Sequence, residues 1–158
     1  MVRVTDDTLP IMSFQSFGKS TEADIAILRP VYLRAFQRGR PMICLSDARL
    51  ATHSVDQRRL WADWLAETNR EDRHGCSIAT VILLDSAVLR SALIALNWVT
   101  PAKIAQHVVA NLDEAFSECR VIAEQRNLHV PTHVWGQIRA WTEAGRTEFA
   151  QRGDRIKR

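Results

Sequence analysis

Apolar and polar positions alternate along the middle of the chain in a pattern typical of strands followed by helices. Short apolar runs at 42–46, 77–84 and 106–110 are each followed by a longer segment in which apolar residues recur every three or four positions. Strands that are apolar at nearly every position lie in sheets covered by helices. The pattern therefore predicts an α/β fold.

The N-terminal part adds strands to this sheet. The segment 10–17 places Ile11, Phe14 and Phe17 among polar residues and is closed by a glycine, which favours a strand. The segment 1–8 is polar with two alternating valines and predicts a weak edge strand or an arm. We expect a mixed sheet of about five strands flanked by helices, a common size for a sheet.

Capping and breaking residues predict where the helices begin and end. Ser20 or Thr21 precedes acidic residues and marks the start of the first helix. Pro30 lies inside that helix and predicts a kink or a late start, and Gly39 ends the helix. N-caps are also predicted for three later helices, at Ser54, Ser86 and Asn111.

The chain divides into one domain and a C-terminal extension. Residues 1–128 form the predicted α/β domain, Pro131 breaks the chain, and residues 129–150 form a helical appendage. Residues 151–158 form a basic tail that we expect to be flexible. The last helix either packs on its own domain or pairs with a second copy as a homodimer, and the pattern leaves both open.

Composition limits the function classes. The chain has 158 residues, 46% hydrophobic and 25% charged, which is ordinary for one globular domain. The net charge of +3 owes much to the terminal tail, so we expect no specific nucleic-acid site. Three widely spaced cysteines indicate a reducing compartment without disulfides. No segment predicts a secretory signal or a transmembrane span, so we expect a cytoplasmic protein.

Cofactor and metal motifs are missing from the sequence. Neither a G-x-G-x-x-G nor a G-x-x-x-x-G-K loop is present, and no cysteines are paired as C-x-x-C. His129 and His133 have helical spacing, but a proline lies between them. We therefore expect no cofactor and no metal.

The segment 46–54 is the strongest candidate site. It leaves the C-terminal end of a predicted strand and enters a helix N-terminus, where α/β proteins bind ligands and where free N–H groups attract anions. Thr52 and Ser54 are candidates for an anion or phosphorylation site, whereas the simpler interpretation makes Ser54 only an N-cap. The candidates for contact with a partner are Asp47, Arg49, His53, Arg58, Arg59 and, off the apolar stripe of the last helix, Trp135.

Catalysis has little support. Asp47, His53 and Ser54 are the residue types of a hydrolase triad, but triad members meet in space and usually come from different loops. No serine lies in a G-x-S-x-G motif. We expect a protein that is not an enzyme.

Four segments together resemble a known superfamily: IAILRPVYLRAFQRGRPMICLSDAR, SVDQRRLWADWL, DSAVLRSALIALNWV and NLDEAFSEC. Their order resembles the STAS superfamily of sulfate transporters and anti-sigma factor antagonists over residues 10–124, and is closest to the bacterial STAS-like group, which is also similar to the SEC14 lipid-binding class. Arg90 matches an arginine that follows the third strand segment in that group. The resemblance implies a STAS-like fold.

The resemblance also implies a function. Signalling members carry a phosphorylatable serine or threonine in an Asp-Ser-Ser-Gly-like motif, and the matching place here, 52–56, lacks the glycine. The expectation is a non-catalytic regulatory or protein-interaction module, with a kinase or another regulator as partner and a switch by phosphate beside Arg58 and Arg59. The alternative is a domain that binds a lipid or a small ligand in an apolar pocket between sheet and helices, lined by tryptophans.

Overall fold

The structure is a computed structural model. It describes the backbone of residues 1–52, 54–99 and 103–156, and the side chains of these residues except those at 96–99 and 153–156. His53, one of the predicted partner contacts, lies outside the described residues.

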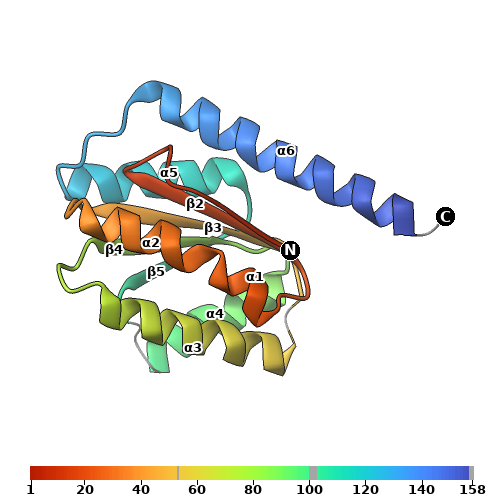
Figure 1. Cartoon of the computed structure of the whole chain (residues 1–158). Helices are drawn as coiled ribbons and strands as arrows, with labels where there is room; N and C mark the ends of the chain where they lie inside the picture. Colours follow the sequence, from red (N-terminus) through yellow and green to blue (C-terminus); the bar gives the residue numbers. More distant parts are fainter. Residues whose placement is uncertain (53, 100–102, 157–158) are drawn as a thin grey trace.

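A five-stranded mixed sheet lies at the centre of the molecule, as the sequence predicts (Figure 1). The strands follow one another across the sheet in chain order. The N-terminal strand pairs antiparallel with its neighbour, and the other strands run parallel to one another. The strands are β1 (Val2–Thr5), β2 (Ile11–Gly18), β3 (Met42–Ala51), β4 (Ser77–Leu83) and β5 (Ala105–Val109).

Helices cover both faces of the sheet. Each crossover from β2 to β5 advances in the same direction, and right-handed crossovers then place the connecting helices on one face. These helices are α1 (Glu22–Ala26), α2 (Leu28–Gln37), α3 (Val55–Glu71) and α4 (Ala87–Val99). The opposite face carries α5 (Leu112–Gln125) and α6 (Thr132–Ile156), the upper helices in Figure 1.

The first helical segment breaks near the proline, as predicted. Thr21 is the N-cap of α1 and forms a capping box with Asp24. A proline at position 30 has no N–H to donate to the carbonyl of Ala26, four residues earlier. Accordingly α1 ends at Ala26 and α2 begins after Ile27. Gly39 follows α2 with a φ of 62°, the left-handed conformation that glycine adopts without strain.

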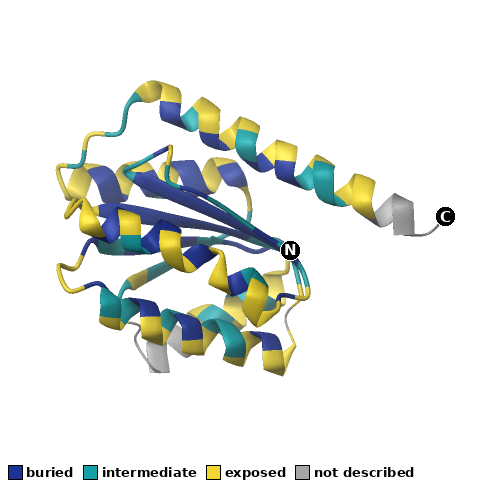
Figure 2. Ribbon diagram, viewed as in Figure 1, coloured by how far each residue is buried: buried dark blue, intermediate teal, exposed yellow. Residues whose placement is uncertain are grey.

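The strands and the helix sides that face them are buried (Figure 2), and apolar side chains pack on both faces of the sheet. On the α5 face, Ile43 is 0% exposed and packs in one cluster with Phe116 of α5. On the other face, the Trp64 ring lies edge-on to Tyr32 at 5.0 Å between ring centroids and to Phe14 at 6.4 Å. Trp64 is therefore part of the core.

Strand β3 extends to Ala51, beyond its predicted end at residue 46. The predicted loop at 46–54 is therefore wrong over most of its length. The strand continues to Ala51 because β2 continues beside it as far as Gly18, which pairs with Ala51. The backbone N–H of Thr52 then donates to the carbonyl of Gly18 at 2.8 Å. The connection to α3 spans only residues 52–54, so Asp47 and Arg49 lie within a strand.

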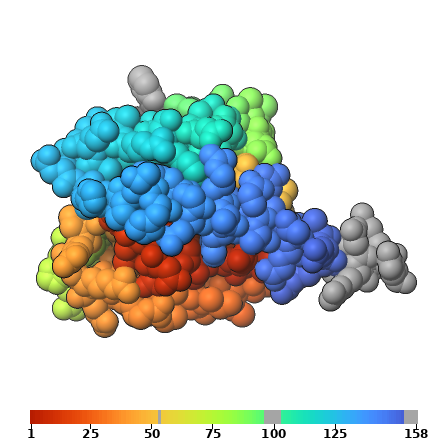
Figure 3. Space-filling view, turned by 90° about the horizontal axis from the view of Figure 1, so that it is seen from above, coloured from red at the N-terminus to blue at the C-terminus, as the bar shows by residue number. Residues whose placement is uncertain are grey.

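Helix α6 packs on the domain itself, next to α5 and over the N-terminal strands (Figure 3). Val134 and Ile138 are 3% and 0% exposed and join the apolar cluster of the α5 face. Of the two arrangements left open by the sequence, the structure shows docking within one chain. The helix also continues to Ile156, past position 150 where the sequence analysis placed its end, so residues 151–156 extend the helix.

Replacing Ile138 tests whether α6 belongs to the core. Ile138→Ala removes a fully buried side chain and leaves a cavity, so we expect the free energy of unfolding to fall by about 2–5 kcal/mol in a urea titration. The matched control is Gln137→Ala at an exposed neighbouring position, expected to change stability by less than about 0.5 kcal/mol. Equal small effects of both variants would mean that α6 does not pack as described.

Candidate functional site

The C-terminal ends of the parallel strands meet at one edge of the sheet, where four helices begin. Four predicted N-caps are present there. Their side chains accept hydrogen bonds from backbone N–H groups of the first turns at 3.2 Å for Thr21, 3.3 Å for Ser54, 3.3 Å for Ser86 and 2.9 Å for Asn111. This edge therefore brings together the two candidate phosphorylation positions and the starts of α1, α3, α4 and α5.

Ser54 and Thr52 both lie on the surface of this edge. The Ser54 hydroxyl caps α3 by accepting from the N–H of Gln57, and Ser54 itself is exposed. Thr52 is exposed as well. Both residues that carry the candidate hydroxyls therefore lie on the surface.

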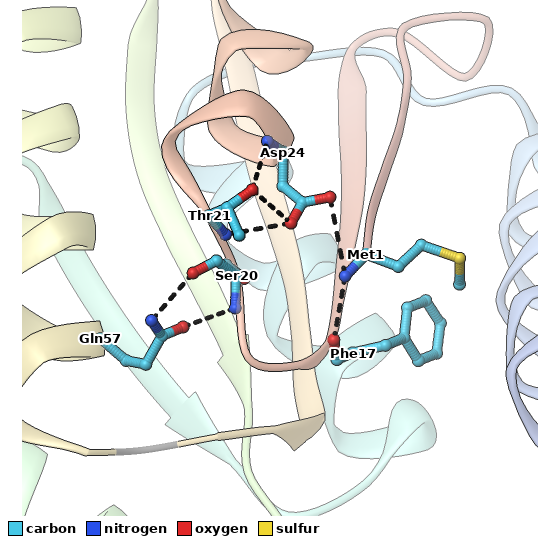
Figure 4. A network of polar contacts seen from close by, with 6 residues as sticks. All are labelled: Met1, Phe17, Ser20, Thr21, Asp24 and Gln57. Carbon is cyan, nitrogen blue, oxygen red and sulfur yellow. Dashed lines mark hydrogen bonds and ion pairs between the residues drawn. The ribbon is translucent and has the colours of Figure 1, made fainter. Parts of the chain in front are cut away.

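The buried side chain of Gln57 holds the start of α3 against the loop that follows β2 (Figure 4). Its Oε1 accepts from the Ser20 N–H at 2.6 Å, and its Nε2 donates to the Ser20 carbonyl at 2.9 Å. Gln57 is 3% exposed. No pattern in the sequence marks this residue as buried, because a glutamine in the first turn of a helix ordinarily lies in solvent.

Asp24 connects the start of α1 with Met1, the first residue of the chain. Its carboxylate accepts from the N–H and hydroxyl of Thr21 at 3.0 and 2.9 Å and lies 3.7 Å from the amino group of Met1, which also donates to the Phe17 carbonyl (Figure 4). Burial alone raises the pKa of Asp24, but the hydrogen bonds from Thr21 and the Met1 charge outweigh it and hold the pKa below its ordinary value. The carboxylate is ionised and serves as a structural acceptor.

The first turn of α3 exposes one apolar and two basic side chains. Val55 is 70% exposed, and Arg58 and Arg59 are exposed. In the described part of the chain, neither guanidinium lies within ion-pair distance of a carboxylate. Since Arg58 follows Ser54 by four residues, the two lie on the same side of the helix. We call the surface formed by Thr52, Ser54, Val55, Arg58 and Arg59 the α3 start.

Asp47 and Arg49 lie elsewhere, in a polar network between the sheet and α6. The guanidinium of Arg49 donates to both carboxylate oxygens of Asp47 at 2.8 Å. Gln15, which is 0% exposed, donates to Asp47 at 3.1 Å and to the carbonyl of Thr142 in α6 at 3.0 Å. Arg3 donates to the carbonyl of Trp141 at 3.4 Å. The network therefore joins strands β1, β2 and β3 to one turn of α6.

The charges of this network stabilise each other. Burial by itself raises the pKa of Asp47, but the hydrogen bonds and charge of Arg49 and the hydrogen bond from Gln15 outweigh it, so the pKa lies below its ordinary value. The hydrogen bonds to Asp47 raise the pKa of Arg49. Both groups are therefore charged at neutral pH, and their side chains are only 8% and 9% exposed.

The predicted partner contacts thus separate into two groups. Arg58 and Arg59 are exposed, whereas Asp47 and Arg49 are covered in this arrangement of α6. Trp135 is half-buried between α5 and α6, where its ring lies 5.4 Å from that of Phe116.

Alternation of polar residues in the extended β3, with Asp47 and Arg49 two positions apart on one face, is the signal that distinguishes a strand from a loop here.

A catalytic triad at Asp47, a metal cluster and a membrane-spanning helix are not found among the described residues. Both carboxylate oxygens of Asp47 are bound by Arg49, which does not suit the orienting acid of a triad. Within the described ranges, no cluster of His, Cys, Asp and Glu is arranged to hold a metal ion. No helix in those ranges is both long and apolar enough to cross a membrane. A hollow of about 490 Å³ on the α2–α3 surface has mostly charged walls, Leu33, Glu67, Arg70, Glu71 and Arg73, unlike the apolar pocket expected for a lipid.

Comparison with known proteins identifies the fold. No protein-family model and no curated protein matches the chain. A crystal structure of an uncharacterised DUF3478-family protein from Shewanella loihica PV-4, described as having a SpoIIAA-like fold, is 16% identical with a TM-score of 0.56, over 75% of this chain and 93% of that one. The anti-sigma factor antagonist SpoIIAA in its unphosphorylated form is 14% identical with a TM-score of 0.53, over 76% of this chain and 98% of its own. The chain therefore has a SpoIIAA-like, STAS-type fold, as the resemblance predicted.

Neutralising Asp47 should destabilise the fold in a pH-dependent way. Asp47→Asn leaves the Arg49 charge buried without its partner, which typically costs about 3 kcal/mol at pH 7. Because the folded-state pKa of Asp47 lies below the ordinary 3.8, this contribution is complete above that value and is lost as the pH falls through the folded-state pKa. In urea titrations from pH 7 to pH 2, the difference between wild type and variant should therefore shrink toward zero.

The control for this experiment removes both charges. Asp47→Leu combined with Arg49→Met leaves no unpaired charge, so it should destabilise the chain less than Asp47→Asn alone. A difference between wild type and Asp47→Asn that stays constant down to pH 2 would contradict the buried ion pair.

Removing the Gln57 amide should loosen the candidate site. Gln57→Ala leaves the buried N–H and carbonyl of Ser20 without their partners, so we expect a loss of about 2 kcal/mol in the free energy of unfolding. Arg58→Ala, at the exposed next position, is the matched control and should be neutral within about 0.5 kcal/mol. If the two variants unfold at the same urea concentration, Gln57 does not hold the two segments together.

Proposed function

We propose that this chain is a non-catalytic regulatory module that binds a protein partner through the α3 start. The observation that carries the proposal is the exposed group of one valine and two arginines beside Thr52 and Ser54, which are also exposed. Exposed apolar and arginine side chains that the fold does not use are typical of contact surfaces. SpoIIAA, which shares the fold, is an anti-sigma factor antagonist, and this supports a regulatory role.

A phosphate on Ser54 would change this surface strongly. Phosphoserine carries nearly two negative charges at pH 7, and a helix N-terminus stabilises such an anion. Arg58 lies one helical turn further along on the same side and offers a charged donor to the phosphate. A kinase is therefore one expected partner, and the phosphate would draw Arg58 away from a second, regulated partner.

Free thiols at all three cysteines agree with a cytoplasmic site of action.

Capture of partners by charge variants tests the proposal. The intact chain, immobilised and exposed to lysate of its own host, should retain a stoichiometric partner. Arg58→Ala with Arg59→Ala should reduce this retention at least about tenfold, since two charged hydrogen bonds are lost. Arg126→Ala, an exposed arginine at the end of α5, is the matched control and should retain the partner fully. Retention that the double variant leaves unchanged would rule out the α3 start as the contact.

The switch is tested at Ser54 with variants that keep the helix cap. Asp and Asn both cap helices as well as Ser does, so Ser54→Asp adds a charge and Ser54→Asn adds none, at equal stability. We expect Ser54→Asp to weaken retention of the same partner about tenfold, whereas Ser54→Asn retains it. Equal retention by both variants would argue against a charge switch at this position.

A further inference from the structure

The two halves of α6 bury different kinds of surface. In the first half, Val134 and Ile138 enter the apolar cluster beneath α5. The second half, from Trp141 onward, approaches the sheet through backbone carbonyls that accept from Arg3 and Gln15. Its main apolar contact is the ring of Phe149, stacked on Phe17 at 5.0 Å between ring centroids. The second half is therefore held mainly by polar contacts.

The strip of sheet beneath the second half is polar. Along β2 and β3 it presents Ser13, Gln15, Asp47 and Arg49 on the face toward α6, all of them largely buried. Covered faces of such sheets are normally apolar. The hydroxyl of Ser13 has no hydrogen-bond partner among the described residues, so water would improve its surroundings.

Removing the second half of α6 would expose this strip at little energetic cost. The ion pair between Asp47 and Arg49 lies within β3 and does not need the helix. Gln15 and Arg3 would exchange carbonyl acceptors on α6 for water, an exchange that is nearly balanced. Arg3 would also leave the Trp141 ring, 4.9 Å away, and its partly exposed ion pair with Glu148 at 3.9 Å, two contacts of a kind that contributes little in solvent. Segments with few buried apolar contacts and many replaceable polar contacts open locally at low free energy.

Gly145 shows that the contact is a close fit. A Cβ atom built at this position would lie 2.1 Å from an Nη of Arg3 and 2.2 Å from Oε1 of Gln15, so a larger residue would displace the ends of these two side chains from their present contacts with the helix. Glycine inside a helix also lowers helix stability by about 1 kcal/mol relative to alanine. The same residue thus permits tight docking and weakens the docked helix.

We propose that the second half of α6 is a releasable cover over a polar strip formed by Arg3, Gln15, Asp47 and Arg49. While α6 is docked, its own carbonyls occupy the donors of the strip. When it lifts, the strip presents amide and guanidinium donors together with one carboxylate. The first half of α6 stays packed in the core. This inference stands on contacts away from the α3 start and does not depend on the proposed function.

Cysteine accessibility in the intact chain tests the release. Thr142 is 2% exposed on the underside of α6, and Thr142→Cys keeps the backbone carbonyl that Gln15 uses. The internal reference is Cys119, 0% exposed on the buried side of α5, whose pKa burial raises to about 12, so that it reacts only when uncovered. In excess thiol reagent without denaturant, we expect the cysteine at 142 to react at least about tenfold faster than Cys119. Equal rates that rise together with urea would show that α6 leaves only on global unfolding and would overturn the proposal.

A second variant ties the release to the stacked rings. Phe149→Ala in the Thr142→Cys background removes the contact with Phe17, and we expect a further several-fold rise in the rate at position 142 with no change at Cys119. Gln151→Ala, exposed on the same helix, is the matched control and should leave both rates unchanged. Should Thr142→Cys fail to fold, hydrogen exchange of the unaltered chain decides: faster amide exchange at 143–150 than at 134–140 supports release, and equal protection contradicts it.

Discussion

The buried ion pair between Asp47 and Arg49 is the interaction on which much of the α6 side of this structure depends. A charged pair within a sheet is favourable only when its hydrogen bonds are satisfied. Here Arg49 and Gln15 together supply donors to both carboxylate oxygens of Asp47. Gln15 uses its second donor on α6, so satisfying the pair also positions the helix. The place of α6 and the burial of two charges are therefore linked through one network.

The same principle separates structural from exposed polar groups at the other end of the molecule. The side chains of Gln57 and Asp24 form hydrogen bonds within the fold, whereas those of Arg58 and Arg59 are exposed. A polar side chain whose partners all lie inside the fold contributes to stability and cannot also serve a partner protein. This distinction, and no catalytic geometry, directs attention to the α3 start. The fold itself is shared with SpoIIAA at only 14% identity, because the apolar pattern is enough to specify the architecture.

Much of the fold was predictable because it rests on local rules. Apolar periodicity located the strands and helices, and Thr21, Ser54, Ser86 and Asn111 cap helices as their residue types require. The errors arose where distant residues decide. Residues 47–51 carry two charged side chains, and their place in β3 depends on the distant Gly18, which pairs with Ala51, and on Gln15, which binds Asp47. The docking of α6 through Gly145 depends on Arg3 and Gln15, more than a hundred positions earlier in the chain, and no local pattern reveals such a contact.

The most direct test of this account is the pKa of Asp47 itself, measured in the intact chain by NMR titration of its side-chain carboxyl carbon. A buried carboxylate bound by Arg49 and Gln15 should titrate below the ordinary value of 3.8. Its titration should also shift the resonances of α6 residues near Thr142. Titration at or above the ordinary value, with no response from α6, would show that Arg49 and Gln15 do not stabilise the carboxylate and would contradict the network that seats the helix.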